Sequence, residues 1–240
     1  MPTCLANQNI KPLLHELLKE GGITPSEELI TNLEVYLGEL YSWNQRINLT
    51  GLKTIEEMAL KHIGDTLTLI RFLPKGVHHV LDIGTGPGVP GLILKLFRPD
   101  LEIVLIDAIR KKVSFLNTVI AIIGLTDIWA EHCRMSPKDI PRHFPPESFD
   151  VIVSQAVGPL DELARMARPL LSPNGLVIAM KGPKADEELE GKMGYLQRHG
   201  WKAGIIKTKT PVSSFQRSLV ILVPERKPPL FVISTVGRNL

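Results

Sequence analysis

The stretch LDIGTGPGVPG at residues 81–91 decides the fold, because an apolar run that ends at Ile83 must turn sharply into a helix that begins near Val89. The turn contains three glycines, Gly84, Gly86 and Gly88. Glycine adopts backbone angles closed to other residues, and its missing side chain lets a ligand approach the backbone. The N-terminus of the following helix is expected to offer unpaired N–H groups and a positive dipole end to a ligand's carboxylate. The stretch therefore predicts a strand, a ligand-binding turn and a helix, in that order.

Two carboxylates accompany this turn. Asp82 precedes it and is expected to attract a ligand's ammonium group. Asp107 ends the second predicted strand about 20 residues later, where a carboxylate can accept hydrogen bonds from both hydroxyls of a ribose. The letters Gly86-x-Gly88-x-x-Gly91 also satisfy the dinucleotide fingerprint. The motif alone thus leaves two cofactors open, S-adenosylmethionine and NAD.

The segment before the turn is helical in its apolar spacing. Between Ile10 and Phe72 apolar residues recur every three or four positions, which predicts two or three amphipathic helices, one of them starting at Thr24. We interpret residues 1–73 as a small N-terminal helical subdomain.

The segment after Pro74 alternates short β-branched runs with helical segments, which predicts a parallel sheet. The five predicted parallel strands are 77–83, 101–107, 127–132, 149–154 and 176–180, and the predicted helices are 89–97, 110–123, 160–171 and 184–199. Two further strands, 202–211 and 217–225, leave no room for a crossover helix and should pair antiparallel. This α/β pattern resembles the seven-stranded, Rossmann-like class I methyltransferases that use S-adenosylmethionine. A nicotinamide enzyme would need a second βαβαβ half, so residues 74–225 are interpreted as the cofactor-binding domain and 226–240 as a loose tail.

Composition narrows the class of protein. The 240 residues carry a net charge of only +3, which does not by itself indicate a nucleic-acid partner. The two cysteines, Cys4 and Cys133, lie far apart, so we expect no disulfide framework and a reducing, cytoplasmic location. The sequence contains neither a leading apolar segment nor a run of the roughly 18 apolar residues that a membrane span requires, so secretion and membrane insertion are not expected. His132 and Cys133 lack further ligands at zinc-like spacing, and no metal is expected.

Six segments together resemble the RsmG (GidB) family, bacterial enzymes that methylate N7 of a guanosine in 16S ribosomal RNA. They are WNQRINLTGL (43–52), KHIGDTL (61–67), LDIGTGPGVPGLIL (81–94), LIDAIRKKVSFL (105–116), VSQAVGPL (153–160) and AMKGP (179–183). The combination is specific, since GTGPG alone occurs in many methyltransferases.

The resemblance implies positions for the cofactor. Gly84 and Val89 would line its methionine side, Asp107 would meet the ribose, and Met135 with Ser136 would lie beside the adenine. Gln155 at the end of the fourth strand departs from the family, which usually has arginine there. Because of this departure, a methyltransferase-like RNA-binding protein with reduced turnover is an alternative to the methyltransferase. A NAD-dependent oxidoreductase is the other alternative. The resemblance also places Asn44, Asn48, His62 and Asp65 at the cofactor's entrance, whereas capping and turn bonds would explain them equally well.

The implied reaction demands little of side chains. N7 of guanine has an in-plane lone pair and bears no proton, so it can attack a sulfonium methyl group without a general base, and catalysis by positioning is expected. Lys181, after the fifth strand, is our candidate for a contact to guanine O6 or a phosphate, with a solvated surface lysine as the alternative. The expected partner is 16S rRNA or a small-subunit precursor, bound by a monomer.

Basic residues gather in two places that could form a phosphate-binding surface or simply solvated faces. One set is Arg110, Lys111 and Lys112, and the other is Arg198, Lys202, Lys207, Lys209, Arg217, Arg226 and Lys227.

Overall fold

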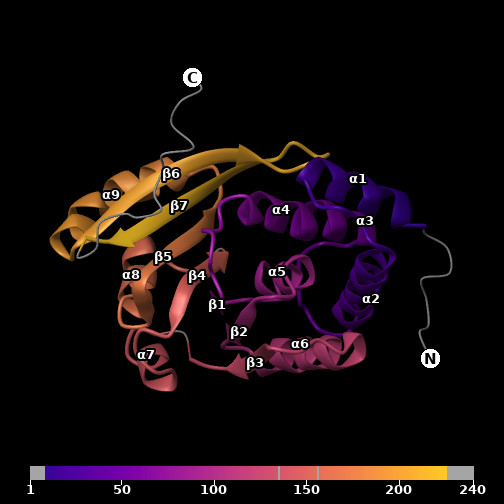
Figure 1. Cartoon of the computed structure of the whole chain (residues 1–240), viewed down its shortest axis with the longest axis horizontal. Helices are drawn as coiled ribbons and strands as arrows, with labels where there is room; N and C mark the ends of the chain where they lie inside the picture. The colour runs from indigo at the N-terminus through magenta and orange to yellow at the C-terminus, as the bar shows by residue number, and fades with distance from the viewer. Residues whose placement is uncertain (1–8, 135, 156, 226–240) are drawn as a thin grey trace.

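A seven-stranded sheet runs through the middle of the molecule (Figure 1). The computed structural model describes residues 9–134, 136–155 and 157–225. The strands are β1 (His79–Ile83), β2 (Glu102–Asp107), β3 (Ile128–His132), β4 (Phe149–Gln155), β5 (Leu171–Lys181), β6 (Trp201–Lys209) and β7 (Gln216–Pro224). Their order is β3-β2-β1-β4-β5-β7-β6. The first five strands are parallel and β7 is antiparallel to both β5 and β6, which confirms the predicted topology.

Helices cover both faces of the sheet. They are α5 (Gly91–Phe97), α6 (Arg110–Ile123), α7 (Ile140–His143), α8 (Leu160–Ala167) and α9 (Ala185–Arg198), and α6 has the bounds that its apolar spacing predicted. The helix predicted to reach residue 171 is wrong in its last turn, since α8 stops at Ala167. Pro169 follows closely, and because proline has no N–H it cannot donate the next hydrogen bond of the helix.

The N-terminal segment forms α1 (Lys11–Gly21), α2 (Glu27–Asn44) and a third helix in three parts: α3 (Ile55–Met58), a π-helical turn η1 (Ala59–Ile63) and α4 (Gly64–Ile70). The predicted start of the second helix at Thr24 is wrong. Ser26 is the N-cap, and its side chain accepts a hydrogen bond from the Leu29 N–H at 3.1 Å. Both Thr24 and Ser26 are capping residues, so the proline between them did not distinguish the two.

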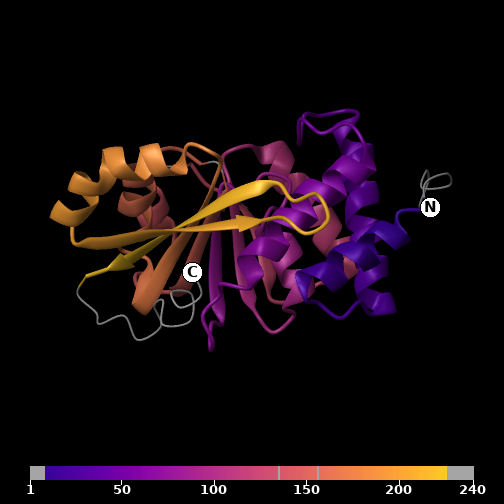
Figure 2. The same ribbon diagram turned by 90° about the horizontal axis from the view of Figure 1, so that it is seen from above.

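The core has two layers, one on each face of the sheet, because successive residues of a strand point to opposite faces. In β4, for example, Val151 and Val153 join the cluster under α1, α2, α5 and α6, whereas Ile152 joins the cluster under α8 and α9. Burial on both faces explains why the strands read as continuous apolar runs. The helices before residue 73 share the first cluster with the sheet, and Figure 2 shows them on the side of the sheet that α5 and α6 cover. No helix in the described part of the chain is long and apolar enough to cross a membrane.

Candidate functional site

The glycine-rich turn connects β1 to α5, and its glycines have two different roles. Gly84, Gly86 and Gly88 have φ of 72°, 59° and 94°, in the left-handed region that favours glycine. A Cβ on Gly88 would lie 2.8 Å from Leu92 Cβ, so this glycine permits helix packing. A Cβ on Gly86 would meet only a carbonyl oxygen at 3.9 Å. Gly86 is therefore the position where a missing side chain leaves space for a ligand.

A cavity of about 360 Å³ opens beside this turn, at the carboxyl ends of β1, β2 and β4. It is lined by Gly84, Thr85, Gly86, Pro87, Val89, Asp107, Ala108, Ile109, Lys112, Gln155 and Val157. Five of the predicted cofactor-binding residues are thus brought together: Gly84, Gly86, Val89, Asp107 and Gln155. Ligands of open α/β sheets bind at this edge, where the strand order reverses between β1 and β4.

The expectation of unpaired N–H groups at the turn is wrong. Every N–H group between residues 84 and 91 has an acceptor within the protein, and the two prolines of the turn have no N–H. The acceptors are the carbonyl oxygens of Ile106 and Thr85 and the carboxylates of Asp107 and Asp82. Donors for an anionic group must therefore come from the cavity wall, which contains the cation Lys112.

Asp107 is held in place from both sides. One carboxylate oxygen accepts the Ile109 N–H at 2.8 Å, and the other accepts the Gly86 N–H at 3.0 Å and lies 3.8 Å from Lys112 Nζ. The residue is only 5% exposed but lines the cavity. The carboxylate therefore couples the glycine-rich turn to the end of β2 at the wall of the cavity.

Asp82 lies behind the turn rather than in the cavity wall. It is fully buried, and its Oδ2 accepts the Gly91 N–H at 2.8 Å. Burial raises the pKa of Asp82 to about 7, although the bond from Gly91 opposes this rise. A Cβ on Gly91 would lie 2.7 Å from that oxygen and 2.3 Å from Leu105 Cδ2. These contacts favour a role in shaping the turn over the predicted contact to a ligand's ammonium group.

Tyr36 of α2 is a site residue that the sequence did not reveal. Its side chain is fully buried, and its hydroxyl donates a hydrogen bond to the Pro87 carbonyl oxygen at 3.1 Å. Burial raises the pKa of this hydroxyl, so it stays a donor. The only signal in the sequence is a hydroxyl-bearing residue within the apolar stripe of Leu29, Leu33, Leu37 and Leu40. Through Tyr36 the N-terminal helices fix the position of the glycine-rich turn.

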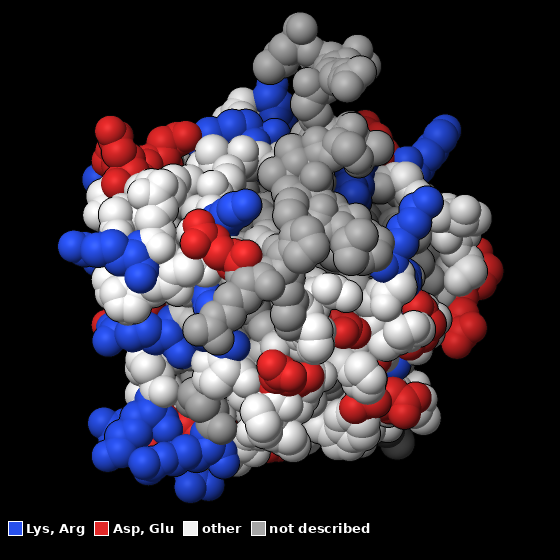
Figure 3. Space-filling model, turned by 60° about the vertical axis from the view of Figure 1, so that its left-hand side comes forward, with Lys and Arg blue, Asp and Glu red and all other residues white. Residues whose placement is uncertain are grey.

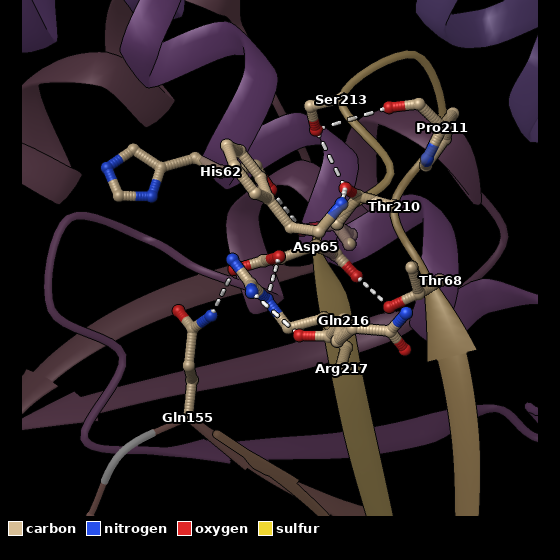
Figure 4. A network of polar contacts seen from close by, with 11 residues as sticks. His62, Asp65, Thr68, Gln155, Thr210, Pro211, Ser213, Gln216 and Arg217 are labelled. Carbon is tan, nitrogen blue, oxygen red and sulfur yellow. Dashed lines mark hydrogen bonds and ion pairs between the residues drawn. The ribbon is translucent and has the colours of Figure 1, made fainter. Parts of the chain in front are cut away.

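Asp65 joins three elements at the edge of the cavity (Figure 4). Gln155 Nε2, at the end of β4, donates to one carboxylate oxygen at 2.8 Å, and Arg217 Nε of β7 donates to the other at 2.6 Å. Asp65 is only 4% exposed, and burial raises its pKa while the two donors lower it. The guanidinium of Arg217 therefore stands close to Gln155, where the family usually has an arginine.

Two other residues that the resemblance placed at the entrance, His62 and Asn44, make different contacts. His62 Nε2 is buried and has no hydrogen-bond partner among the described residues, and burial lowers the pKa of His62 to about 4. Asn44 makes turn bonds: its Oδ1 accepts the N–H groups of Leu49 and Thr50 at 2.9 and 3.0 Å. Of the four residues that the resemblance placed at the entrance, Asp65 is thus the one whose contacts reach a cavity-lining side chain, Gln155.

Ser136 and Lys181 are not part of the cavity lining. Met135 is not among the described residues. Ser136 forms a local turn, in which its hydroxyl donates to Asp139 Oδ2 at 2.6 Å. Lys181 Nζ donates to the Gly158 carbonyl oxygen at 2.8 Å and to Glu188 Oε1 at 2.9 Å, and its side chain is only 10% exposed. These partners favour a structural role for Lys181, which anchors the segment after β4, over the predicted contact to guanine.

The basic residues of β6 are divided between the two faces of the strand. Lys202 and Lys207 lie five positions apart on β6, so their side chains point to opposite faces of the strand, and Lys207 is paired with Asp186. Arg226 and Lys227 lie outside the described residues. The face in Figure 3 carries both signs of charge, with a compact group of basic side chains at its lower left. No group of three or more potential metal ligands occurs within the described ranges.

Comparison with known proteins agrees with this geometry. Residues 29–220 match the profile of the family described as rRNA small subunit methyltransferase G, GidB. A relative of that name from Geobacter sp. (strain M21) is 36% identical over 218 residues, which cover 90% of this chain and 98% of the relative. Another from Geobacter sulfurreducens is 38% identical, over 87% of this chain and 94% of the relative.

Solved structures share the fold. A SAM-dependent methyltransferase from Aquifex aeolicus superposes with a TM-score of 0.53 at 16% identity, over 69% of this chain and 93% of that one. P. horikoshii TYW2, solved in complex with MeSAdo, gives a TM-score of 0.52 at 16% identity, over 68% of this chain and 63% of that one. These likenesses show the methyltransferase fold, and the sequence relatives show the family: the chain belongs to the rRNA small subunit methyltransferase G family.

Proposed function

We propose that this protein transfers a methyl group from S-adenosylmethionine to N7 of a guanosine in 16S ribosomal RNA. The observation that carries the proposal is the cavity at the carboxyl ends of β1, β2 and β4, which joins the glycine-rich turn, Asp107 and Gln155 in a member of this family. The relatives, which match this chain over nearly their whole length, are named as small-subunit rRNA methyltransferases. We place the reaction in the cytoplasm, on 16S rRNA or a precursor of the small subunit.

The cavity suits the cofactor in size and chemistry. Its volume of about 360 Å³ lies in the range of small-molecule sites, roughly 300–1,000 Å³. Gly86 leaves open space where a side chain would stand, and Asp107 presents a carboxylate that can accept bonds from ribose hydroxyls. Lys112, whose Nζ lies 3.8 Å from Asp107 Oδ2, adds positive charge to the same side of the cavity. The residues present therefore fit S-adenosylmethionine without any metal.

The protein's task is to hold two reactants in line. S-adenosylmethionine supplies an electrophilic methyl group on a positively charged sulfur. The guanine N7 lone pair forms the new C–N bond as the C–S bond breaks, the sulfur keeps the electron pair of the broken bond, and the positive charge passes to the base. No proton moves in this step, so no side chain needs to act as a base. Fixing the two reactants can contribute several kcal/mol by removing the entropic cost of their encounter, on the order of 7 kcal/mol in well-oriented cases.

Gln155 fits this scheme as a neutral, oriented residue. Ionised Asp65 can only accept hydrogen bonds, so the amide nitrogen of Gln155 must face it at 2.8 Å. Its amide oxygen is then free to accept a bond from the cavity side. Arg217, which is paired with the same carboxylate, brings a guanidinium close to Gln155.

A methyl-transfer assay tests the proposal. The protein is incubated with tritiated S-adenosylmethionine and small-subunit RNA from cells that lack the modification, and RNA-bound label is counted. We expect stoichiometric, saturable label on 16S rRNA and none on 23S rRNA. Binding of S-adenosylmethionine without transfer would instead support an RNA-binding protein that has lost turnover.

A further inference from the structure

Phe215 is an exposed aromatic residue in the loop that joins β6 to β7, and cations lie on its ring. It is 39% exposed. The Arg217 guanidinium carbon lies 5.5 Å from the ring centroid, and Lys61 Nζ of η1 lies 6.0 Å from it. Both distances are within the range of cation–π attraction. Arg217 follows Phe215 by two positions, whereas Lys61 is far away in the sequence and is brought to the ring by the fold.

The loop holds Phe215 in a defined position. Its N–H donates to Thr210 Oγ1 at 2.9 Å, and its carbonyl oxygen accepts the Thr210 N–H at 3.0 Å. The tip is tied to α1, where the Val212 N–H donates to the Glu20 carboxylate at 2.6 Å, and the hairpin end lies beside α1 in Figure 1. Val212 and Ser214 have φ of 60° and 51°, a conformation that costs free energy for residues with side chains. Such strain concentrates at functional sites.

A series of side-chain contacts connects the Phe215 ring to the cofactor cavity. Arg217, which contacts the ring, is bound to Asp65, and Asp65 is bound to Gln155 in the cavity wall. Dashed lines in Figure 4 join Asp65 to both Gln155 and Arg217. Asp65 is buried and pairs with Arg217, and Lys61 reaches the ring from η1, where the exposed Glu57 carboxylate one turn earlier also interacts with it.

We propose that Phe215 is a stacking platform for a nucleobase of single-stranded RNA, with Lys61 and Arg217 contacting its phosphates, next to the target guanosine. This inference rests on the proposed function and deepens it. Every base offers a π-face and every nucleotide a negative charge, so an exposed ring with cations over it suits single-stranded nucleic acid. A base that stacks on the ring would displace the Lys61 side chain from it, and the ammonium group would then pair with a phosphate. A target base must leave its stack to reach a cavity, and stacking of a neighbouring base holds the strand open.

The test compares Phe215→Leu with Trp129→Leu. Trp129 is a matched control, since it is 46% exposed, lies on β3 at the opposite edge of the sheet, and has no cation over its ring among the described residues. Fluorescence anisotropy measures the Kd for a single-stranded oligonucleotide of 16S sequence and, separately, for inorganic polyphosphate, which has no bases. We expect Phe215→Leu to weaken RNA binding about tenfold and to leave polyphosphate binding unchanged, with Phe215→Trp at the parent level. Trp129→Leu should match the parent for both ligands.

Further measurements keep the inference falsifiable. Lys61→Gln should lower the slope of log K against log salt by about 0.7, the value for one phosphate contact to a single strand. Unchanged RNA affinity in Phe215→Leu, or an equal loss of RNA affinity in Trp129→Leu, would refute the proposal that Phe215 stacks on a base. A parent protein that binds RNA through Phe215 but transfers no methyl group would refute the proposed function and leave the platform standing. Melting curves of each variant report whether the fold is intact.

Discussion

Replacing Gly86 by alanine should separate backbone strain from ligand contact at the cavity. Gly86 has φ of 59°, and an added Cβ would point into open space. Alanine in this conformation costs on the order of 1 kcal/mol, which lowers the melting temperature of a chain of this length by roughly 2–4 °C. Gly124 is a matched control: it ends α6 with φ of 76°, has nothing within 4 Å of an added Cβ, and does not line the cavity.

The two variants should therefore melt alike but bind differently. Isothermal titration calorimetry with S-adenosylmethionine measures the Kd of each protein. We expect Gly124→Ala to bind as the parent does and Gly86→Ala to bind at least about tenfold more weakly, equivalent to about 1.4 kcal/mol. The loss follows from a methyl group placed where the ligand approaches the backbone. Equal affinities for the two variants would refute the assignment of this cavity to the cofactor.

Three further substitutions test the shell of the site. Asp82→Asn removes a carboxyl whose pKa is raised to about 7. The folded parent binds this proton more tightly than the unfolded chain does, so the stability of the parent should fall as pH rises from about 4 to 7. Urea unfolding at pH 5 and pH 7 should show that the difference in unfolding free energy between parent and variant changes by about 2 kcal/mol. A pH-independent difference would contradict the buried, protonated carboxyl. Tyr36→Phe leaves the Pro87 carbonyl oxygen without its donor, which should lower the free energy of unfolding by about 1–3 kcal/mol and weaken S-adenosylmethionine binding. A variant that melts and binds as the parent does would show that this hydrogen bond does not hold the turn. Lys181→Met should lower the melting temperature without raising the KM for RNA, because its partners are Glu188 and the segment after β4; a raised KM with unchanged melting would instead support a contact to guanine.

The elements of the fold could be predicted because local patterns determine them. Strands buried on both faces are continuous apolar runs, α6 repeats its apolar residues at helical spacing, and the short connection between β6 and β7 allows only antiparallel pairing. The start of α2 was harder, since Thr24 and Ser26 are both capping residues and only the backbone conformation distinguishes them.

The site could be predicted only where its residues lie at the ends of predicted strands. Gly86 and Asp107 were found by their position at the ends of strands. The bonds of Asp65 to Gln155 and Arg217 span 90 and 152 residues, so no local pattern reveals them. The supply of free N–H groups at the turn was overestimated for the same reason, because the acceptor carbonyl of Ile106 belongs to the neighbouring strand.

The most direct test of the whole account is the position of the methyl group. RNA methylated by the protein is treated with borohydride and aniline, which cleave the chain at N7-methylguanosine, and the fragments are read by primer extension. We predict one new cleavage site in 16S rRNA, dependent on S-adenosylmethionine and much weaker with the Gly86→Ala protein. Label incorporated without cleavage, or cleavage unaffected by that substitution, would contradict the account.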